Sequence, residues 1–259
     1  MNSSASTAAE TARASDLSNS VAVIAGACDD CGAGIARYLS SRGAALALCG
    51  ADRDALDSLV AEIVAAGGQA IVAGSEQSAA IPDVVDRVRS KFGKIDVLVN
   101  NPGEVAGRSV ELPASEFEKS LAAILTTAFG FLHAVVPAMR ERRYGRIINV
   151  YGLAYLGLPA QANLAAAYAG IFGLTRSVAL ETAADGITVN SVVKGDIARS
   201  NLAAADADKL AGQIPVKRIG TAADVARAVG FFALPSTKYV TGQTLFVCGG
   251  RSAYFSMSV

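Results

Sequence analysis

Short apolar runs alternate with longer amphipathic stretches along nearly the whole chain. The runs are apolar at consecutive positions, as in strands that are covered on both faces of a sheet. Seven segments have this pattern: Val21–Ala25, Ala45–Leu48, Gln69–Val72, Val97–Asn100, Arg146–Val150, Thr188–Val192 and Thr244–Val247. Helical spacing of apolar residues separates them, over Ile35–Arg42, Asp54–Ala66, Ile81–Phe92, Ser115–Arg140, Leu164–Ala183 and Ala222–Leu234. This alternation predicts an α/β fold: one doubly wound domain with a mainly parallel sheet of about seven strands.

No linker, internal repeat or change of composition divides this pattern, so we expect a single domain over residues 21–259. Residues 1–20 are rich in Ser, Ala and Thr and contain no apolar run, which predicts a flexible N-terminal arm and no secretory signal. The four cysteines are unevenly spaced and do not resemble a disulfide framework. These features favour a cytoplasmic protein.

Two of the predicted helices, Leu121–Met139 and Leu164–Leu180, are apolar around most of their circumference. The first contains Thr126, His133 and Pro137, and a membrane span needs about 20 mostly apolar residues, so we interpret it as a buried helix. A sheet covers only one side of each helix. The opposite sides are therefore expected to meet another subunit.

The charge balance narrows the possible partners. The chain has 23 Lys and Arg residues against 23 Asp and Glu, and a net charge of zero. Nucleic acids and anionic membranes attract concentrated positive charge, so neither is expected to bind. With 259 residues and a hydrophobic fraction of 52%, the chain can bury a substantial core.

The first strand candidate leads into a glycine-containing segment, Gly26–Gly34, before the first helix. Glycines in this place usually let a dinucleotide pyrophosphate approach the helix N-terminus, which gives a Rossmann-type domain its binding site. Here the segment carries Asp29 and Asp30 where the phosphates would lie. Like charges about 4 Å apart repel by roughly 1 kcal/mol in water. We infer that these carboxylates occupy the positive end of the helix in place of phosphates.

Further motifs follow in the same order as in a known family. They are Asn100–Gly103, Gly145–Val150, Gly173–Glu181, Val189–Val192 and Thr241–Thr244. With the glycine segment, they resemble the short-chain dehydrogenase/reductase family from Val21 to about Arg251. The resemblance implies a Rossmann-type domain, a nicotinamide cofactor and the oxidation of alcohols or reduction of carbonyls.

The family's catalytic residues are replaced in this chain. The resemblance implies four positions: an asparagine in a proton relay, a serine that orients the substrate oxygen, a tyrosine as acid–base and a lysine that lowers the tyrosine pKa. These positions hold Ile124, Gly152, Leu164 and Tyr168, respectively. Leucine exchanges no proton, and loss of a general acid–base alone typically costs 10²–10⁴-fold in rate. The chain is thus expected to be a degenerate family member with no catalytic residue.

Other residues near the expected site allow a relocated acid–base as an alternative. Tyr151, Tyr155 and Tyr168 lie near the expected site, and Lys194 replaces a proline of the family pattern. A relocated pair such as Tyr168 with Lys194 is compatible with an active dehydratase or isomerase. No motif spacing supports that pair, so we favour tyrosines that pack inside a filled former pocket.

The cofactor anchors are also altered. Gly50 stands where NAD-binding members often carry an acidic residue, and Ala51 where NADP-binding members often carry arginine. Ser75–Ser78 replaces the family's adenine-contacting motif. We therefore expect weak or absent dinucleotide binding and assign no cofactor-binding residue in this chain.

Cys28 and Cys31 form a C-x-x-C pattern, and Cys49 is expected nearby. A zinc or redox site is the alternative here, but a structural zinc ion takes four ligands and no histidine is close in sequence. We favour cysteines that fill space, and we expect His133 to be a half-exposed interface residue. No metal-binding residue is assigned.

A chain that keeps the fold and the apolar helices but loses the chemistry suggests a partner. We hypothesise a non-catalytic pseudoenzyme subunit beside an active short-chain dehydrogenase paralogue, in a hetero-oligomer such as a heterotetramer. NAD would then bind in the partner subunit. A scaffold that binds a small ligand in the former pocket is a further alternative.

Overall fold

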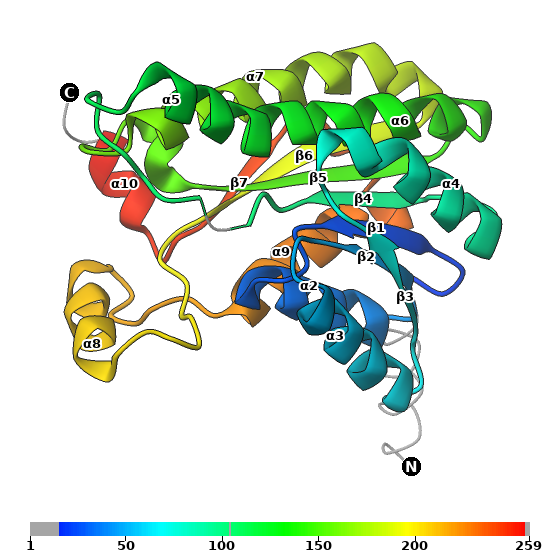
Figure 1. Ribbon diagram of the computed structural model, residues 1–259, viewed down its shortest axis with the longest axis horizontal. Coiled ribbons are helices and arrows are strands. Elements are labelled where there is room, and N and C mark those ends of the chain that lie inside the picture. The colour runs from blue at the N-terminus through cyan, green and yellow to red at the C-terminus, as the bar shows by residue number, and fades with distance from the viewer. Residues whose placement is uncertain (1–15, 104, 257–259) are drawn as a thin grey trace.

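The computed structural model describes residues 16–103 and 105–256, and its centre is a seven-stranded parallel sheet (Figure 1). The strand order is β3-β2-β1-β4-β5-β6-β7, which reverses direction beside β1, as in a doubly wound fold. The strands are β1 (Val21–Ala25), β2 (Ala45–Cys49), β3 (Gln69–Gly74), β4 (Val97–Asn100), β5 (Gly145–Gly152), β6 (Ile187–Lys194) and β7 (Thr244–Val247). The predicted fold class is confirmed.

Helices cover both faces of the sheet (Figure 1). One layer holds α2 (Asp30–Ser41), α3 (Arg53–Ala65) and α9 (Ala222–Ala233). The other layer holds α4 (Ile81–Phe92), α5 (Ala114–Leu121), α6 (Thr127–Glu141) and α7 (Ala162–Thr182). Each face of the sheet packs against one helix layer and forms a hydrophobic core with it. Successive strand residues alternate between the two cores: Ala22 and Ile24 face the first layer, whereas Val21 and Val23 face the second. This double burial explains why the strands are apolar at consecutive positions.

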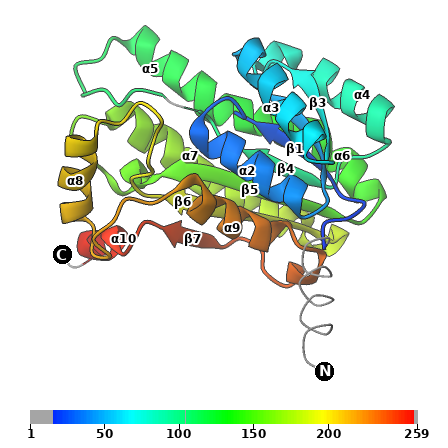
Figure 2. The ribbon, with the colours of Figure 1, turned by 90° about the horizontal axis from the view of Figure 1, so that it is seen from below.

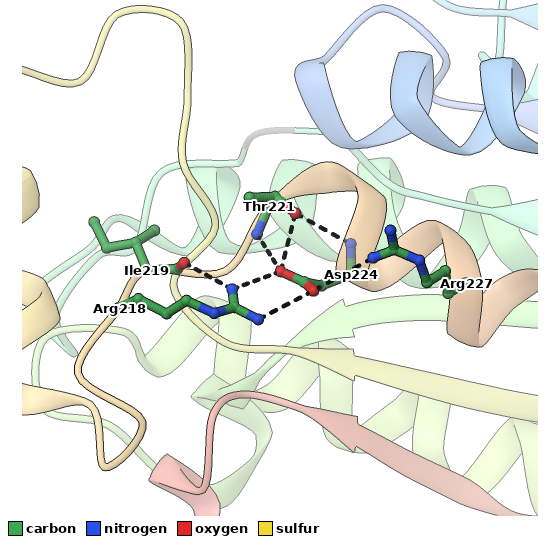
Figure 3. Close-up of polar contacts among 5 residues, drawn as sticks. All are labelled: Arg218, Ile219, Thr221, Asp224 and Arg227. Carbon is green, nitrogen blue, oxygen red and sulfur yellow. Dashed lines mark hydrogen bonds and ion pairs between the residues drawn. The ribbon is translucent and has the colours of Figure 1, made fainter.

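Helix α9 begins with a capping box, and it is fixed by polar contacts rather than by its apolar face alone. The Thr221 side chain accepts a hydrogen bond from the Asp224 backbone, and the Asp224 carboxylate accepts one from the Thr221 backbone (Figure 3). Arg218 adds two further bonds to the same carboxylate, at 2.8 and 3.2 Å. The Cβ of Ala222 lies 2.5 Å from where a side chain on Gly34 would begin, so α9 packs closely on α2.

Two helices were missing from the sequence prediction: α8 (Ala204–Gln213) and α10 (Arg251–Ser256). No residue of α8 is buried, so its sequence has no apolar stripe from which the helix could be predicted. The helix predicted over Ser115–Arg140 is interrupted by a π turn over Ala122–Thr126. Helix α2 begins five residues earlier than predicted because Asp29 caps it.

Residues 1–15 of the predicted N-terminal arm lie outside the described residues. Residues 16–20, which the prediction also placed in that arm, pack on the domain. Leu17 is only 1% exposed, and Asp16 forms an ion pair with Arg42 at the end of α2.

The outward sides of α6 and α7 carry exposed apolar side chains. Phe129 on α6 is 54% exposed and stacks on His133, and Leu180 on α7 is 83% exposed. The continuous helical stretch Ala114–Glu141 is long and apolar enough to span a membrane by length and composition. Its inner face packs in the core beside β4 and β5, with Phe131 and Val135 buried, so here it serves as a core helix.

Candidate functional site

The glycine segment between β1 and α2 holds an internal carboxylate at the place where a Rossmann domain holds phosphate. Asp29 is the N-cap of α2, and its Oδ1 accepts a 2.6 Å hydrogen bond from the Gly32 backbone. The same oxygen accepts a 2.9 Å bond from Nδ2 of Asn101, which follows β4. The inference that a carboxylate occupies this helix end is confirmed for Asp29, where the helix dipole favours negative charge.

Lys194 completes this arrangement from the last residue of β6. Its Nζ lies 3.9 Å from Oδ2 of Asp29 and 3.5 Å from Oδ1 of Asn101. Both charged side chains are largely shielded from solvent, at 14% exposure for Asp29 and 19% for Lys194. The sequence analysis noted the residue type at position 194 but did not predict this ion pair. Asp29, Asn101 and Lys194 thus join the ends of three structural elements.

Asp30 makes a separate contact. Its Oδ2 accepts a 2.6 Å hydrogen bond from the backbone N–H of Ser200, in the segment that follows β6. Thus Asp30 does not lie at the cap position with Asp29; it reaches outward to a different part of the chain. Only one of the two aspartates occupies the helix end.

The retained glycines have a packing role that needs no cofactor. A Cβ on Gly26, where φ is +77°, would lie 1.6 Å from the backbone oxygen of Asn101. A Cβ on Gly32 would lie 2.1 Å from the backbone oxygen of Gly26. Side chains at either position would therefore clash with backbone. The presence of the glycine motif alone does not indicate dinucleotide binding.

The position expected to bind ribose is filled by sulfur. A Cβ on Gly50, after β2, would lie only 2.1 Å from Sγ of Cys28. That thiol also donates a 3.5 Å hydrogen bond to the backbone oxygen of Asp52. An acidic side chain at position 50 would need Cys28 to move.

A cleft of about 600 Å³ remains beside the glycine segment, at the amino ends of α2 and α3. Its wall carries the carboxylates of Asp29, Asp30, Asp52 and Glu76, and the arginine in its wall is Arg199. Burial raises the pKa of Glu76, although hydrogen bonding with the Gly26 backbone partly opposes this. An acidic cleft of this kind disfavours the doubly negative pyrophosphate.

The four positions equivalent to the family's catalytic residues meet at the inner end of the site, but they form an apolar and aromatic wall. Ile124, in the π turn, and Leu164 are buried, and Tyr168 is 6% exposed. A Cβ on Gly152 would meet the Tyr168 ring at 3.4 Å, so the tyrosine ring borders the place of the serine. The cavity between β4, β5 and the π turn has a volume of about 10 Å³, which is room for roughly one water molecule.

Tyr168 is poorly suited to act as an acid–base. Burial, and secondarily the charge of Asp29, raises its pKa to about 12. The ring lies 5.8 Å from that of Tyr151, and burial also raises the pKa of Tyr151. Tyr155 stacks on Phe172, at 5.8 Å. These tyrosines belong to a packed aromatic cluster, and Lys194 contacts Asp29 and Asn101.

The cysteines lie near the cleft but are not activated. Burial raises the pKa of Cys31 to about 11 and also raises the pKa values of Cys28 and Cys49. A reactive thiol needs a lowered pKa. Within residues 16–103 and 105–256, no three Asp, Glu, Cys or His side chains come together as metal ligands. His133 lies on the outer side of α6, stacked on Phe129 at 6.1 Å.

The sequence of this chain is similar to a known family of enzymes over most of its length. A family model described as enoyl-(acyl carrier protein) reductase matches residues 26–252. The 3-oxoacyl-[acyl-carrier-protein] reductase FabG of Escherichia coli is 34% identical over 89% of this chain and 96% of its own length. The chain therefore belongs to the short-chain dehydrogenase/reductase family.

A more similar relative is a subunit of one particular dehydrogenase. Subunit BbsC of (2S)-[(R)-hydroxy(phenyl)methyl]succinyl-CoA dehydrogenase from Thauera aromatica is 48% identical over 95% of this chain and 99% of its own length. Subunit BbsD of the same dehydrogenase is 34% identical over 92% of this chain and 98% of its own. The chain is thus homologous to both subunits and more similar to BbsC.

Solved structures agree with the family assignment. Levodione reductase superposes with a TM-score of 0.85 at 27% identity, covering 91% of this chain and 98% of its own. A short-chain dehydrogenase/reductase from Serratia marcescens gives a TM-score of 0.85 at 28% identity, covering 92% and 99%. Members of the family bind a nicotinamide cofactor in general. The altered cofactor-anchor positions of this chain therefore set it apart from the family pattern.

Proposed function

We propose that this chain is the non-catalytic subunit of a hetero-oligomeric, NAD-dependent short-chain dehydrogenase of the cytoplasm. In this proposal an active paralogous subunit oxidises a hydroxyacyl-CoA such as 2-[hydroxy(phenyl)methyl]succinyl-CoA to benzoylsuccinyl-CoA. Hydride passes from the carbinol carbon to NAD⁺ in the partner, and the hydroxyl proton passes to the partner's acid–base. This chain supplies no group to the transfer.

One observation carries the proposal: Asp29 caps α2 and pairs with Lys194, so a carboxylate of this chain occupies the helix end where a Rossmann domain binds the cofactor phosphate. The positions of the family's serine, tyrosine and lysine hold Gly152, Leu164 and Tyr168. Losing the acid–base and its electrostatic support together removes the main contributions to the rate. The high pKa of Tyr168, about 12, argues against a relocated acid–base.

The exposed apolar faces support a role in assembly. Phe129 and Leu180 are exposed on neighbouring helices, and the small residues Ala166, Ala169 and Gly173 leave room for a partner helix to approach. A second apolar surface, with Phe231, Tyr239 and Leu245 exposed on and around α9 and β7, would allow a heterotetramer. The names of the relatives give a matching precedent, because BbsC and BbsD are two subunits of one dehydrogenase.

Coexpression tests this proposal. The chain, carrying an affinity tag, would be produced with a family paralogue that retains the Ser, Tyr and Lys residues. Copurification, a mass by light scattering that fits both chains, and NAD reduction with the CoA ester are expected. Tyr168→Phe should leave this activity unchanged, whereas substituting the partner's catalytic tyrosine should abolish it. Turnover by the lone chain, or failure of every such paralogue to copurify, would contradict the proposal.

A further inference from the structure

The segment that leaves β6 is anchored at both ends and carries an exposed helix between them. It runs over residues 195–217 and contains α8 (Figure 2). No residue of α8 is buried. Near β6, Ile197 bridges Gly220, the Ala198 N–H donates to the Gly220 oxygen at 2.8 Å, and Asp196 pairs with Arg251. Beyond α8, Ile214 is 2% exposed and the Val216 N–H donates to the Gly249 oxygen at 3.3 Å. A helix without buried residues gains little stability from packing. Between the two anchored ends, the position of α8 is therefore sensitive to further contacts of the segment.

Two such contacts, or tethers, come from the adjacent aspartates of the glycine segment. Asp29 pairs with Lys194, the last residue of β6, directly before the segment, and Asp30 accepts the 2.6 Å hydrogen bond from Ser200 just before α8. Hydrogen bonds to ionised carboxylates are roughly twice as strong as neutral ones. The two contacts bracket the hydrogen bond of Ala198 and connect the segment to the amino end of α2.

We infer that Asp29 and Asp30 act as a built-in replacement for a ligand, holding residues 194–201 against the glycine segment at all times. Asp29 satisfies the amino end of α2 and retains Lys194, while Asp30 retains Ser200. The position of α8 is thereby independent of dinucleotide. The proposal concerns the conformation of this chain alone, so it can be tested whether or not the partner assembly forms.

The variants separate the tethers from general effects of charge. Asp30→Ala removes the contact to Ser200 at an exposed position, so the fold should persist. Asp29→Ser keeps a hydroxyl that can cap α2 but removes the ion pair with Lys194. Asp52→Ser is the matched control, because Asp52 lines the same cleft and caps α3 through Ala55 but makes no tether to the segment after β6.

Hydrogen–deuterium exchange of the full chain, followed by mass spectrometry, measures the effect. We expect amides of residues 199–213 to exchange at least tenfold faster in Asp30→Ala, and faster again in the double variant with Asp29→Ser. Ala198 should remain protected through Gly220, and Asp52→Ser should match the wild type. Equal exchange of residues 199–213 in all variants would overturn the inference.

Adding ADP to the wild type gives a second readout. If the carboxylates already hold the segment, millimolar ADP leaves the exchange of residues 199–213 unchanged. Slower exchange on addition of ADP would mean that a ligand, and not the aspartate pair, positions the segment, and would overturn the inference as well. Neither measurement uses the dehydrogenase assay, so failure here is distinct from failure of the proposed function.

Discussion

The Cys28 sulfur fills the space that any side chain at position 50 would need, because a Cβ on Gly50 would lie 2.1 Å from it. The two residues lie after adjacent strands, β1 and β2, at the carboxyl edge of the sheet. The residue at position 50 is thus coupled by packing to Cys28 in the glycine segment. Restoring an acid here requires both positions to change.

Gly50→Asp should therefore destabilise the chain by about 1–3 kcal/mol, the usual cost of overpacking. Adding Cys28→Ala removes the clashing sulfur and should recover most of that loss. Urea unfolding of the single and double variants measures the coupling. Ala51→Asp, at the neighbouring exposed position, is the control and should stay near wild type. A double variant as unstable as Gly50→Asp alone would contradict this explanation.

Arg146 is a buried cation that binds backbone carbonyl oxygens, so its contribution to stability can be tested by substitution. It is 2% exposed on β5 and donates to the carbonyl oxygens of Leu234, Pro235 and Gly186. Desolvation lowers its pKa. Arg146→Met leaves these carbonyls without a donor, so we expect a loss of about 1–3 kcal/mol in the free energy of unfolding.

The control for Arg146 is Arg143→Met. Arg143 also donates to a backbone carbonyl, that of Ala184, but from an exposed side chain whose acceptor water can satisfy. We expect a change within about 0.5 kcal/mol. Equal effects of the two substitutions, measured by urea unfolding, would show that burial of the cation is unimportant.

The capping box of α9 predicts a pH dependence. Hydrogen bonds from Arg218, and also from Thr221, hold the pKa of Asp224 well below its usual value (Figure 3). Because the folded-state pKa is lowered, the unfolded chain binds more protons in acid. The stabilisation is present above the unfolded pKa of about 4 and is lost as the pH falls below it.

Asp224→Asn tests this dependence, since it keeps an oxygen for the cap and removes the charge. At pH 7 we expect the variant to be less stable than wild type, by about 1 kcal/mol in view of typical capping losses. The difference in urea midpoint should shrink progressively below about pH 4. A difference that stays constant from pH 7 to pH 3 would rule out the charge of Asp224 as its source.

Much of the fold could be predicted from the sequence because strands that are buried on both faces of the sheet consist of unbroken apolar runs. The runs around Ile24 and Val99 are apolar at consecutive positions, and each became a central strand. Helix α8 gave no such signal because it buries nothing. The π turn around Ile124 was also invisible, since its sequence continues the apolar pattern of the helices on either side.

The site was only partly predictable. The glycine segment placed Asp29 near a helix N-terminus, and the helix dipole was enough to infer that a carboxylate occupies this end, although the start of the helix at Asp30 was missed. The contacts of Asp29 with Asn101 and Lys194 join residues far apart in sequence, and no local pattern specifies them. The same holds for Cys28 and Gly50: the sequence indicated a space-filling cysteine and an altered cofactor anchor, and only the fold shows that the Cys28 sulfur lies against Gly50.

The outward face of α7 provides the last prediction, on assembly. Leu180 is 83% exposed in the isolated chain, so Leu180→Arg should change its free energy of unfolding by no more than about 0.5 kcal/mol. If this face meets a partner, however, the substitution removes the burial of a leucine, worth about 2 kcal/mol, or roughly 30-fold in the dissociation constant. Light scattering across a dilution series of the assembled protein measures this shift.

Val64→Arg is the matched control, because Val64 is 53% exposed on α3, which covers the other face of the sheet. If both variants assemble as tightly as the wild type, the interface lies elsewhere; if Val64→Arg alone weakens assembly, it lies on the layer of α2 and α3.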